Sequence, residues 1–468
     1  MRIEHDMLGT LRIEDDVYYG IHTLRALQNF PISLVPIHQE FVDAMVIVKK
    51  AAAITNQRIG SLSHEVASAV ISACDDILSG MLRDQFVVDS LQGGAGTSAN
   101  MNVNEVIANR AIEHLGGQKG EYHLVHPLDH VNLHQSTNDV FPTAVRITAI
   151  RMLKEVSEQF AKLQTALQQK EEEFATIVKV GRTEMQDAVP VTLGQEFGAY
   201  AQAVARDRWR LYKVEERLRQ VNIGGTAIGT GINAPRDYVF AMIDHLRELT
   251  GIGLARAESM IDATQNCDVF AEVSGLLKAA AVSLSKIATD LRLLSSGPRA
   301  GFGEITLPAV QAGSSIMPGK VNPVICEAVN QVAFQVMADD LTITLASQAG
   351  QLELNAFYPL IAKSLFDMLD LLRNTLPLFT HRCVEGIQAN RSVCEEQVAN
   401  SFILVTALTG YIGYEQAAQV AVTCQASGQT VREVVLARGL LTKEQLDIIL
   451  RPQRLTAPDR QVGKGKGL

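Results

Sequence analysis

The sequence lacks an apolar segment of the length that a membrane-spanning helix needs, about 18 residues. Charged residues interrupt every candidate run, and the first six residues already include Arg2, Glu4 and Asp6, so no signal peptide is expected. The six cysteines stand far apart and form no CxxC motif, which is typical of reduced thiols. We therefore expect a cytoplasmic protein with no membrane partner.

A basic block is also missing. The chain carries 42 Lys and Arg against 51 Asp and Glu, a formal net charge of −9. Binding to nucleic acid needs a basic face that neutralises phosphates, so this class of partner is not expected. The acidic balance does not exclude a small anionic substrate, because one or two cations and local dipoles are enough to hold one.

Aromatic residues are scarce, at 5% of the chain with a single tryptophan. A sandwich or barrel is usually rich in such residues, so the composition favours helices packed on helices. Leu193, Phe197, Tyr200, Val204 and Leu211 form part of a heptad-like apolar seam within 193–221. The sequence predicts a mainly all-α fold whose long helices cover 144–180, 193–221, 269–295, 322–348 and 354–375.

Changes in character along the chain divide it into three parts. We expect a mixed N-terminal domain at 1–140, a central long-helix bundle at 141–390 and a small helical C-terminal domain at 391–468. Thr442 and Gln445 match a capping box, and Gly439 is placed to end the preceding helix. The glycine- and lysine-rich tail at 463–467 is expected to be loosely held.

Two tempting motifs are weak. The segment 313–320 resembles a phosphate loop, but five residues rather than four separate Gly313 from Gly319, and Val321 replaces the hydroxyl residue that binds magnesium. His126, His130 and His134 step by four, as metal ligands on a helix would, with His123 nearby. Pro127 argues against a continuous helix, so these histidines are interpreted as surface and loop residues and no metal site is predicted.

Four polar loops stand out because they combine small hydroxyl and amide residues with helix ends. Such residues are expected singly as helix caps, but four loops of this kind exceed what capping requires. Hydroxyls, amides, helix N-termini and one lysine, Lys320, are suited to bind a small dicarboxylate. The loops cover 96–102, 134–139, 181–187 and 313–323.

The segment GSSIMPGKVNP at 313–323 resembles the signature of the aspartase/fumarase superfamily, and the other three loops match its other shared segments in order. The resemblance covers essentially the whole chain. It is closer to aspartases than to class II fumarases, notably at 18–26, 92–98, 118–122, 291–301 and 350–355 and at Thr137. The resemblance implies a central bundle of five long helices and a homotetramer whose active sites draw loops from three subunits.

It further implies reversible deamination of L-aspartate to fumarate, with abstraction of a Cβ proton and an aci-carboxylate intermediate. Ser314 matches the catalytic base, and Lys320 is implied as a second catalytic residue. The remaining implied contacts divide by substrate group. The β-carboxylate would be bound by Thr97, Ser136, Thr137 and Ser315. The α-carboxylate would be bound by Lys320, Asn322 and Thr183, and the amino group would be contacted by Asn138 and Glu184.

Glu184 departs from the family pattern, where histidine or glutamine is found. A carboxylate there is unfavourable beside a dicarboxylate unless the substrate ammonium compensates it or it is protonated. An amine leaving group is therefore favoured over a hydroxyl. A class II fumarase, a related lyase for another amino acid and a non-catalytic helical scaffold remain alternatives.

The sequence predicts no required cofactor, although the resemblance leaves room for activation by a divalent cation. Gly301, Gly303, Gly313 and Gly319 suggest that the segment 313–323 closes over substrate. The alternative is that these glycines only permit turns.

Overall fold

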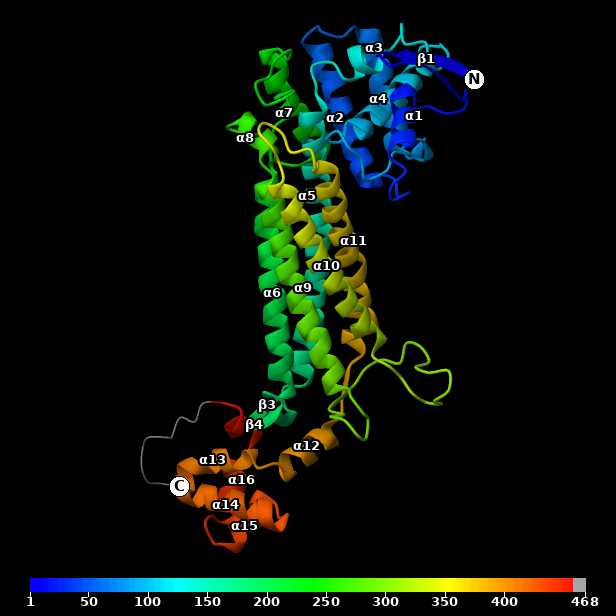
Figure 1. Ribbon diagram of the computed structural model, residues 1–468. Helices are drawn as coiled ribbons and strands as arrows, with labels where there is room; N and C mark the ends of the chain where they lie inside the picture. The colour runs from blue at the N-terminus through cyan, green and yellow to red at the C-terminus, as the bar shows by residue number, and fades with distance from the viewer. Residues whose placement is uncertain (458–468) are drawn as a thin grey trace. The chain divides into compact units, whose positions relative to one another are not determined.

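A computed structural model describes residues 1–457 of the protein. Helices dominate it, and the long ones run side by side (Figure 1). The prediction of a mainly all-α fold is confirmed. In order, the α-helices are α1 (Ile21–Asn29), α2 (Gln39–Arg58), α3 (His64–Leu78), α4 (Thr97–His114), α5 (Thr137–Glu173), α6 (Leu193–Leu218), α7 (Arg236–Thr250), α8 (Met260–Gln265), α9 (Asp268–Leu294), α10 (Val324–Gln348), α11 (Tyr358–Arg382), α12 (Arg391–Asn400), α13 (Ile403–Ile412), α14 (Tyr414–Ser427), α15 (Val431–Ala437), α16 (Lys443–Ile449) and α17 (Pro452–Leu455).

The strands are short and pair two by two. Three pairs are antiparallel, and the pair β5–β6 is parallel. The strands are β1 (Arg2–Asp6), β2 (Gly9–Ile13), β3 (Val178–Thr183), β4 (Gln186–Thr192), β5 (Gln220–Val221), β6 (Ala255–Arg256), β7 (Ile305–Thr306) and β8 (Gln388–Ala389).

The described chain forms two compact units, each made of three segments. The first unit contains 1–157, 209–281 and 334–373, and the second contains 158–208, 282–333 and the described residues from 374 on. Each of the five long helices α5, α6, α9, α10 and α11 contributes residues to both units. The three-part division expected from the sequence stays a prediction.

The long helices form because their apolar residues recur on one face. All members of the predicted seam on α6 and just beyond it are buried, from Leu193 to Val221. Polar contacts add specificity in each unit. In the first, Ser274 on α9 donates to Asp340 on α10 at 2.7 Å; in the second, Tyr200 on α6 donates to Asp290 on α9 at 3.0 Å.

The boundaries of the first long helix were predicted wrongly at both ends. α5 begins at Thr137 rather than 144, because the Ser136 side chain accepts the Asn138 amide and starts the helix; Pro142 lies inside it. It ends at Glu173 rather than 180, because the chain turns into strand β3. The polar loop expected at 181–187 is largely the β3–β4 hairpin.

The C-terminal helices have a small core of their own, to which Leu408, Val420, Val435, Leu446 and Ile449 contribute. The predicted capping box at Thr442 and Gln445 is present, and a second one joins Thr430 and Glu433. Gly439 has the left-handed φ of +64° that suits the end of a helix. The predicted tail at 463–467 lies outside the described residues.

Within residues 1–457, none of the helices is both long and apolar enough to cross a membrane.

Glycines flank both ends of α4 and provide a matched test of packing. Gly96 has φ +93°, and a Cβ atom there would overlap the Phe141 ring, whereas Gly116 has φ +77° with open space around it. Gly116→Ala is expected to cost about 1–2 kcal/mol of unfolding free energy from backbone strain alone. Gly96→Ala is expected to cost about 2–5 kcal/mol, because overpacking adds to strain. Denaturant unfolding of both variants measures the difference, and equal losses would contradict the packing argument.

Candidate active site

Four predicted substrate-binding residues lie together in the first unit, at the N-termini of α4 and α5. We call Thr97, Ser136, Thr137 and Asn138 the helix-end group. The close approach of Gly96 to Phe141 brings the start of α4 against the first turns of α5. Asn100 on α4 also donates to the Thr137 hydroxyl at 3.2 Å. Two helix N-termini therefore lie close together, an arrangement that favours a bound carboxylate.

The loop before α5 is fixed by a buried carboxylate. Asp139 is fully buried and accepts the amides of Ser136, Gly224 and Thr226, each at 3.0 Å. Burial raises the pKa of Asp139 to about 7, although these donors oppose the shift. Asn138 is held in turn, since its side chain donates to the Ala227 carbonyl at 2.7 Å.

A buried lysine supports the same loop, and the sequence analysis missed it. The Lys49 ammonium donates to the side-chain oxygens of Asn132 at 2.9 Å and Gln135 at 3.0 Å. Burial lowers the pKa of Lys49 to about 7. The available signal was a lysine pair at 49–50 inside the otherwise apolar centre of α2, where only one lysine is able to face solvent.

A cleft of about 490 Å³ opens beside the helix-end group. The residues that line it include Asn132, His134, Ser136, Thr226 and Ala227. Its walls offer hydroxyl and amide groups, as a small polar substrate requires.

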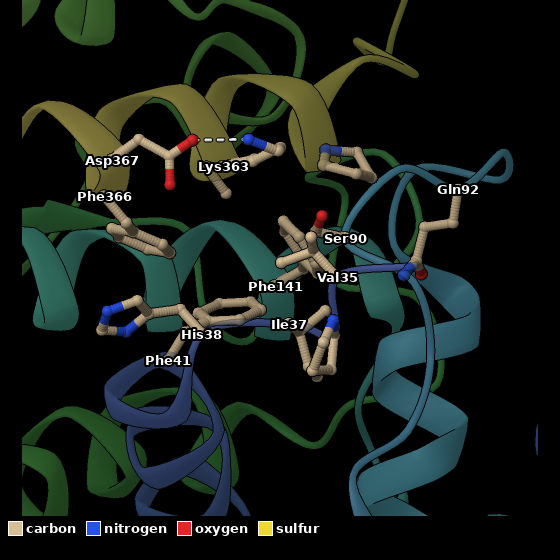
Figure 2. Close-up of a pocket in the computed structure, with 13 residues that line it drawn as sticks. Val35, Ile37, His38, Phe41, Ser90, Gln92, Phe141, Lys363, Phe366 and Asp367 are labelled. Carbon is tan, nitrogen blue, oxygen red and sulfur yellow. Dashed lines mark hydrogen bonds and ion pairs between the residues drawn. The ribbon is translucent and has the colours of Figure 1, made fainter. Parts of the chain in front are cut away.

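An apolar pocket lies nearby in the same unit (Figure 2). Phe41, Phe141 and Phe366 face its interior, while His38 lies at one end and Gln92 at the other. Its volume is about 80 Å³. Two basic residues that line it, His38 and Lys363, are already paired with Asp370 and Asp367. A dicarboxylate needs several free donors to replace its hydration, so this pocket is a poor site for such a substrate.

The other predicted residues lie in the second unit. We call Thr183, Glu184, Ser314, Ser315, Lys320 and Asn322 the loop group. Thr183 and Glu184 are exposed at the tip of the β3–β4 hairpin, where Thr183 pairs with Gln186. Glu184 and Met185 have φ of +54° and +64°, the paired left-handed conformation of a tight two-residue turn.

A buried ion cluster anchors this hairpin. The fully buried Glu304 binds Arg182 at 2.7 Å and Lys179 at 3.0 Å. The Arg182 guanidinium also stacks on the Phe302 ring at 4.2 Å. Because Arg182 directly precedes Thr183, the cluster fixes the base of the turn that presents Thr183 and Glu184.

The predicted base, Ser314, has a distinctive environment. Its Oγ accepts the amides of Ile316 at 3.2 Å and Met317 at 3.1 Å. Two backbone donors aimed at one hydroxyl oxygen stabilise negative charge on it. Asn322 closes the base of the same loop by donating to the Gly313 carbonyl at 2.6 Å, and the exposed Lys320 lies between them in sequence.

The glycines around this loop have structural reasons to be glycine. Side chains at Gly301 and Gly313 would overlap neighbouring backbone, and Gly303 and Gly319 have left-handed φ of +59° and +82°. The turns therefore account for all four, and closure of the loop stays a prediction.

The histidine cluster is not helical over its length. Residues Pro127–Val131 form one π-helical turn, in which His130 Nδ1 accepts the His126 amide at 2.9 Å. No group of three His, Cys, Asp or Glu side chains suited to a metal ion occurs among residues 1–457.

The structure brings the helix-end group together in the first unit, where Ser136 lines the cleft. The loop group lies on two separate segments of the second unit: Thr183 and Glu184 on the hairpin tip, and the other four residues in the 313–323 loop.

Comparisons with known proteins show the family of the chain. The family described as "Lyase" matches residues 9–338, and "Fumarase C C-terminus" matches residues 404–457. An aspartate ammonia-lyase of Bacillus subtilis (strain 168) is 49% identical over 457 residues, covering 98% of this chain and 96% of that protein. One of Helicobacter pylori (strain J99 / ATCC 700824) is 49% identical over 460 residues, covering 98% of each.

Solved structures are similar over the same length. Fumarate lyase:delta crystallin from Brucella melitensis bound to cobalt is 50% identical with a TM-score of 0.95, covering 98% of this chain and all of that one. A recombinant class II fumarase from Schistosoma mansoni is 35% identical with a TM-score of 0.94, covering 98% and 99%.

The chain therefore belongs to the lyase family that contains aspartases and class II fumarases. Its predicted place on the aspartase side of that family is confirmed by the aspartate ammonia-lyases among its relatives.

The buried Asp139 provides a pH-dependent test of the helix-end group. Its pKa is higher in the folded protein than the ordinary 3.8. The folded protein therefore binds more protons between about pH 4 and 7, and the unfolding free energy falls as pH rises through that window. Lys49 is charged in both the folded and the unfolded protein below about pH 6, so it adds little to the pH dependence of the unfolding free energy there.

Asp139→Asn removes this titration. We therefore compare the unfolding free energies of the variant and the wild type at each pH, from their denaturant midpoints. The difference is expected to shift in favour of the variant by about 4 kcal/mol between pH 4 and pH 7. The lost carboxylate hydrogen bonds give a separate, pH-independent offset. A difference that stays constant with pH would mean that Asp139 is ionised throughout.

Proposed function

We propose that the protein catalyses the reversible elimination of ammonia from L-aspartate to give fumarate. The observation that carries this proposal is the Ser314 hydroxyl, which accepts two backbone amides in the signature loop of an aspartase-like chain. The reaction breaks the Cβ–H and Cα–N bonds and forms a Cα=Cβ double bond. Its difficult step is removal of a proton beside a carboxylate, which places a second negative charge on that group.

Charge stabilisation is assigned to the helix-end group. Thr97, Ser136 and Thr137, joined by Ser315, offer hydroxyls to the β-carboxylate as it becomes an aci-carboxylate. The N-termini of α4 and α5 add their dipoles, which favour negative charge and need no rearrangement during the reaction. Asp139 and Lys49 act on substrate only indirectly, by holding the loop that carries Ser136 and Asn138.

Proton abstraction is assigned to Ser314. A serine hydroxyl is a weak base, so the protein has to stabilise its alkoxide form. The amides of Ile316 and Met317 already point at Oγ and strengthen as hydrogen bonds when that oxygen becomes negative. The same oxygen accepts the Cβ proton and returns it in the reverse direction.

The α-carboxylate is assigned to Lys320, Asn322 and Thr183, and the ammonium to Asn138 and Glu184. Lys320 supplies positive charge, and Asn322 and Thr183 supply neutral donors. Glu184 sits on a tight exposed turn, so its carboxylate is well placed to face the substrate ammonium. The ammonium charge offsets the repulsion between Glu184 and the substrate carboxylates.

The elimination involves no net electron transfer, so the proposal requires no redox cofactor. Activation by a divalent cation remains a proposal of its own, and a chelator added to the assay tests it. We place the protein in the cytoplasm because its six cysteines are buried and reduced, a state that suits a reducing compartment.

We further propose a homotetramer in which the helix-end group of one subunit meets loop groups from others. An uncharged stripe on α10 supports self-association. Phe334, Leu341 and Leu345 are 60%, 59% and 55% exposed, and with Ala338 they follow a spacing of four, three and four residues. Contiguous apolar residues at this spacing indicate a helix-packing surface.

Fumarate formation from L-aspartate and from L-malate, measured side by side, tests the reaction. We expect fumarate from L-aspartate alone, because Glu184 suits an ammonium better than a hydroxyl leaving group. Fumarate from malate alone would replace the proposal with a fumarase. Activity with neither substrate would indicate a lyase for another amine.

Ser314→Ala separates catalysis from binding in the same assay. We expect kcat to fall by at least about 10³-fold, as loss of a base that acts only in the transition state requires. KM should change little. Ser61→Ala, outside both groups, is the matched control. A modest fall in kcat would mean that a residue other than Ser314 abstracts the proton.

Leu341→Glu tests the homotetramer. A buried unpaired charge costs several kcal/mol at an interface, so we expect a smaller oligomer and loss of activity together. Val422→Glu, on the exposed face of α14, is the control and should leave the oligomer intact. Size-exclusion chromatography with light scattering measures both. If the Leu341→Glu protein is still a tetramer, the exposed face of α10 is not part of the subunit interface.

A further inference from the structure

Two buried cysteines approach each other in the second unit. Cys326 lies in the first turn of α10, and Cys383 directly follows α11. Their sulfur atoms are 3.6 Å apart, close enough for one thiol to donate a hydrogen bond to the other. A disulfide requires a separation of about 2.05 Å, so closing the gap needs a movement of about 1.5 Å.

A small cavity opens beside this pair. Both cysteines line it, together with Pro308, Asn322, Pro323 and Arg382. Its volume is about 10 Å³, roughly the space that one water molecule needs. Hydrogen peroxide is only slightly larger than water, so it is the class of oxidant that this cavity suits; glutathione disulfide is far too large.

The cysteine pair is linked directly to the loop group. Asn322 lines the same cavity and stands four residues before Cys326. It also ties the base of the 313–323 loop through its bond to the Gly313 carbonyl. Asn322 lies two residues before α10, and its carbonyl accepts the Val324 amide at 2.9 Å, so a movement of Cys326 that shifts the first turn of α10 also shifts Asn322 and the loop.

We propose that Cys326 and Cys383 form a disulfide when the protein meets hydrogen peroxide, and that this disulfide reversibly lowers activity. One sulfur attacks a peroxide oxygen, which breaks the O–O bond and gives a sulfenic acid and water. The second sulfur then attacks the first and releases another water. Overall two thiols and one peroxide give one disulfide and two waters, with both thiol protons carried away in water.

Burial of the pair makes the oxidation slow, so that it occurs only at high concentrations of hydrogen peroxide. The hydrogen bond between the two thiols, together with burial, raises the pKa of Cys383, so its reactive thiolate is rare. The pair therefore stays reduced in ordinary conditions. The disulfide itself does not depend on the proposed function, whereas its effect on activity does.

The test uses full-length protein treated with hydrogen peroxide, then with catalase, then with an alkylating reagent. We expect free thiols to fall from six to four and peptide mapping to join Cys326 to Cys383. Aspartate deamination should fall about tenfold or more, as displacement of a binding group by an ångström or so predicts. Dithiothreitol should restore both thiols and activity.

Three variants make the outcome decisive. Cys326→Ala and Cys383→Ala should each abolish the cross-link and the reversible loss, and either one suffices if the other fails to fold. Cys394→Ala, another buried cysteine of the second unit, should behave as wild type. Six free thiols after peroxide would overturn the disulfide, even in a preparation with no lyase activity.

Two other results would also overturn the regulatory step. A mapped disulfide with unchanged activity would show that the pair oxidises without effect. A loss that dithiothreitol does not reverse, and that persists in both cysteine variants, would assign the damage to oxidation of other side chains, such as the exposed Met317 or Met185.

Discussion

The apolar packing of the five long helices is the constraint on which everything else depends. The proposed substrate loops are short and polar, so they bury little apolar surface and cannot hold their own shape. In each unit they attach to the ends of long helices whose seam residues, such as Phe197 and Leu211, are buried. The bundle fixes those ends, and the loops then need only a few hydrogen bonds to define their conformation.

Buried charges supply many of those bonds. Asp139 gathers three backbone amides around the loop before α5, and Glu304 gathers Arg182 and Lys179 beneath the β3–β4 hairpin. Such groups are costly to bury unless fully paired, and their pairing makes one loop geometry much more favourable than its alternatives. In both units, buried charged residues that are not proposed to contact the substrate hold in place the residues that are.

Glu184 and the cysteine pair show how the chain adapts a shared framework. Glu184 brings a carboxylate to a turn where the family pattern has a histidine or glutamine, and in the proposed reaction the substrate ammonium offsets its charge. Cys326 and Cys383 lie 3.6 Å apart beside a cavity that Asn322 of the signature loop also lines, so the proposed disulfide acts on that residue. Neither feature alters the fold. Both act on residues that the fold had already placed.

The sequence by itself determined the helical class, the seam on α6 and the capping box at Thr442, because periodicity and motifs are local properties of the chain. The residues of both groups stay predictions. The sequence misplaced both ends of α5, since the start depends on the Ser136 cap and the end on strand pairing in the β3–β4 hairpin. Tertiary structure alone decided that Lys49 lies beneath the 134–139 loop and that Cys326 meets Cys383. Those contacts join residues 83 and 57 positions apart, and only packing brings such distant positions together.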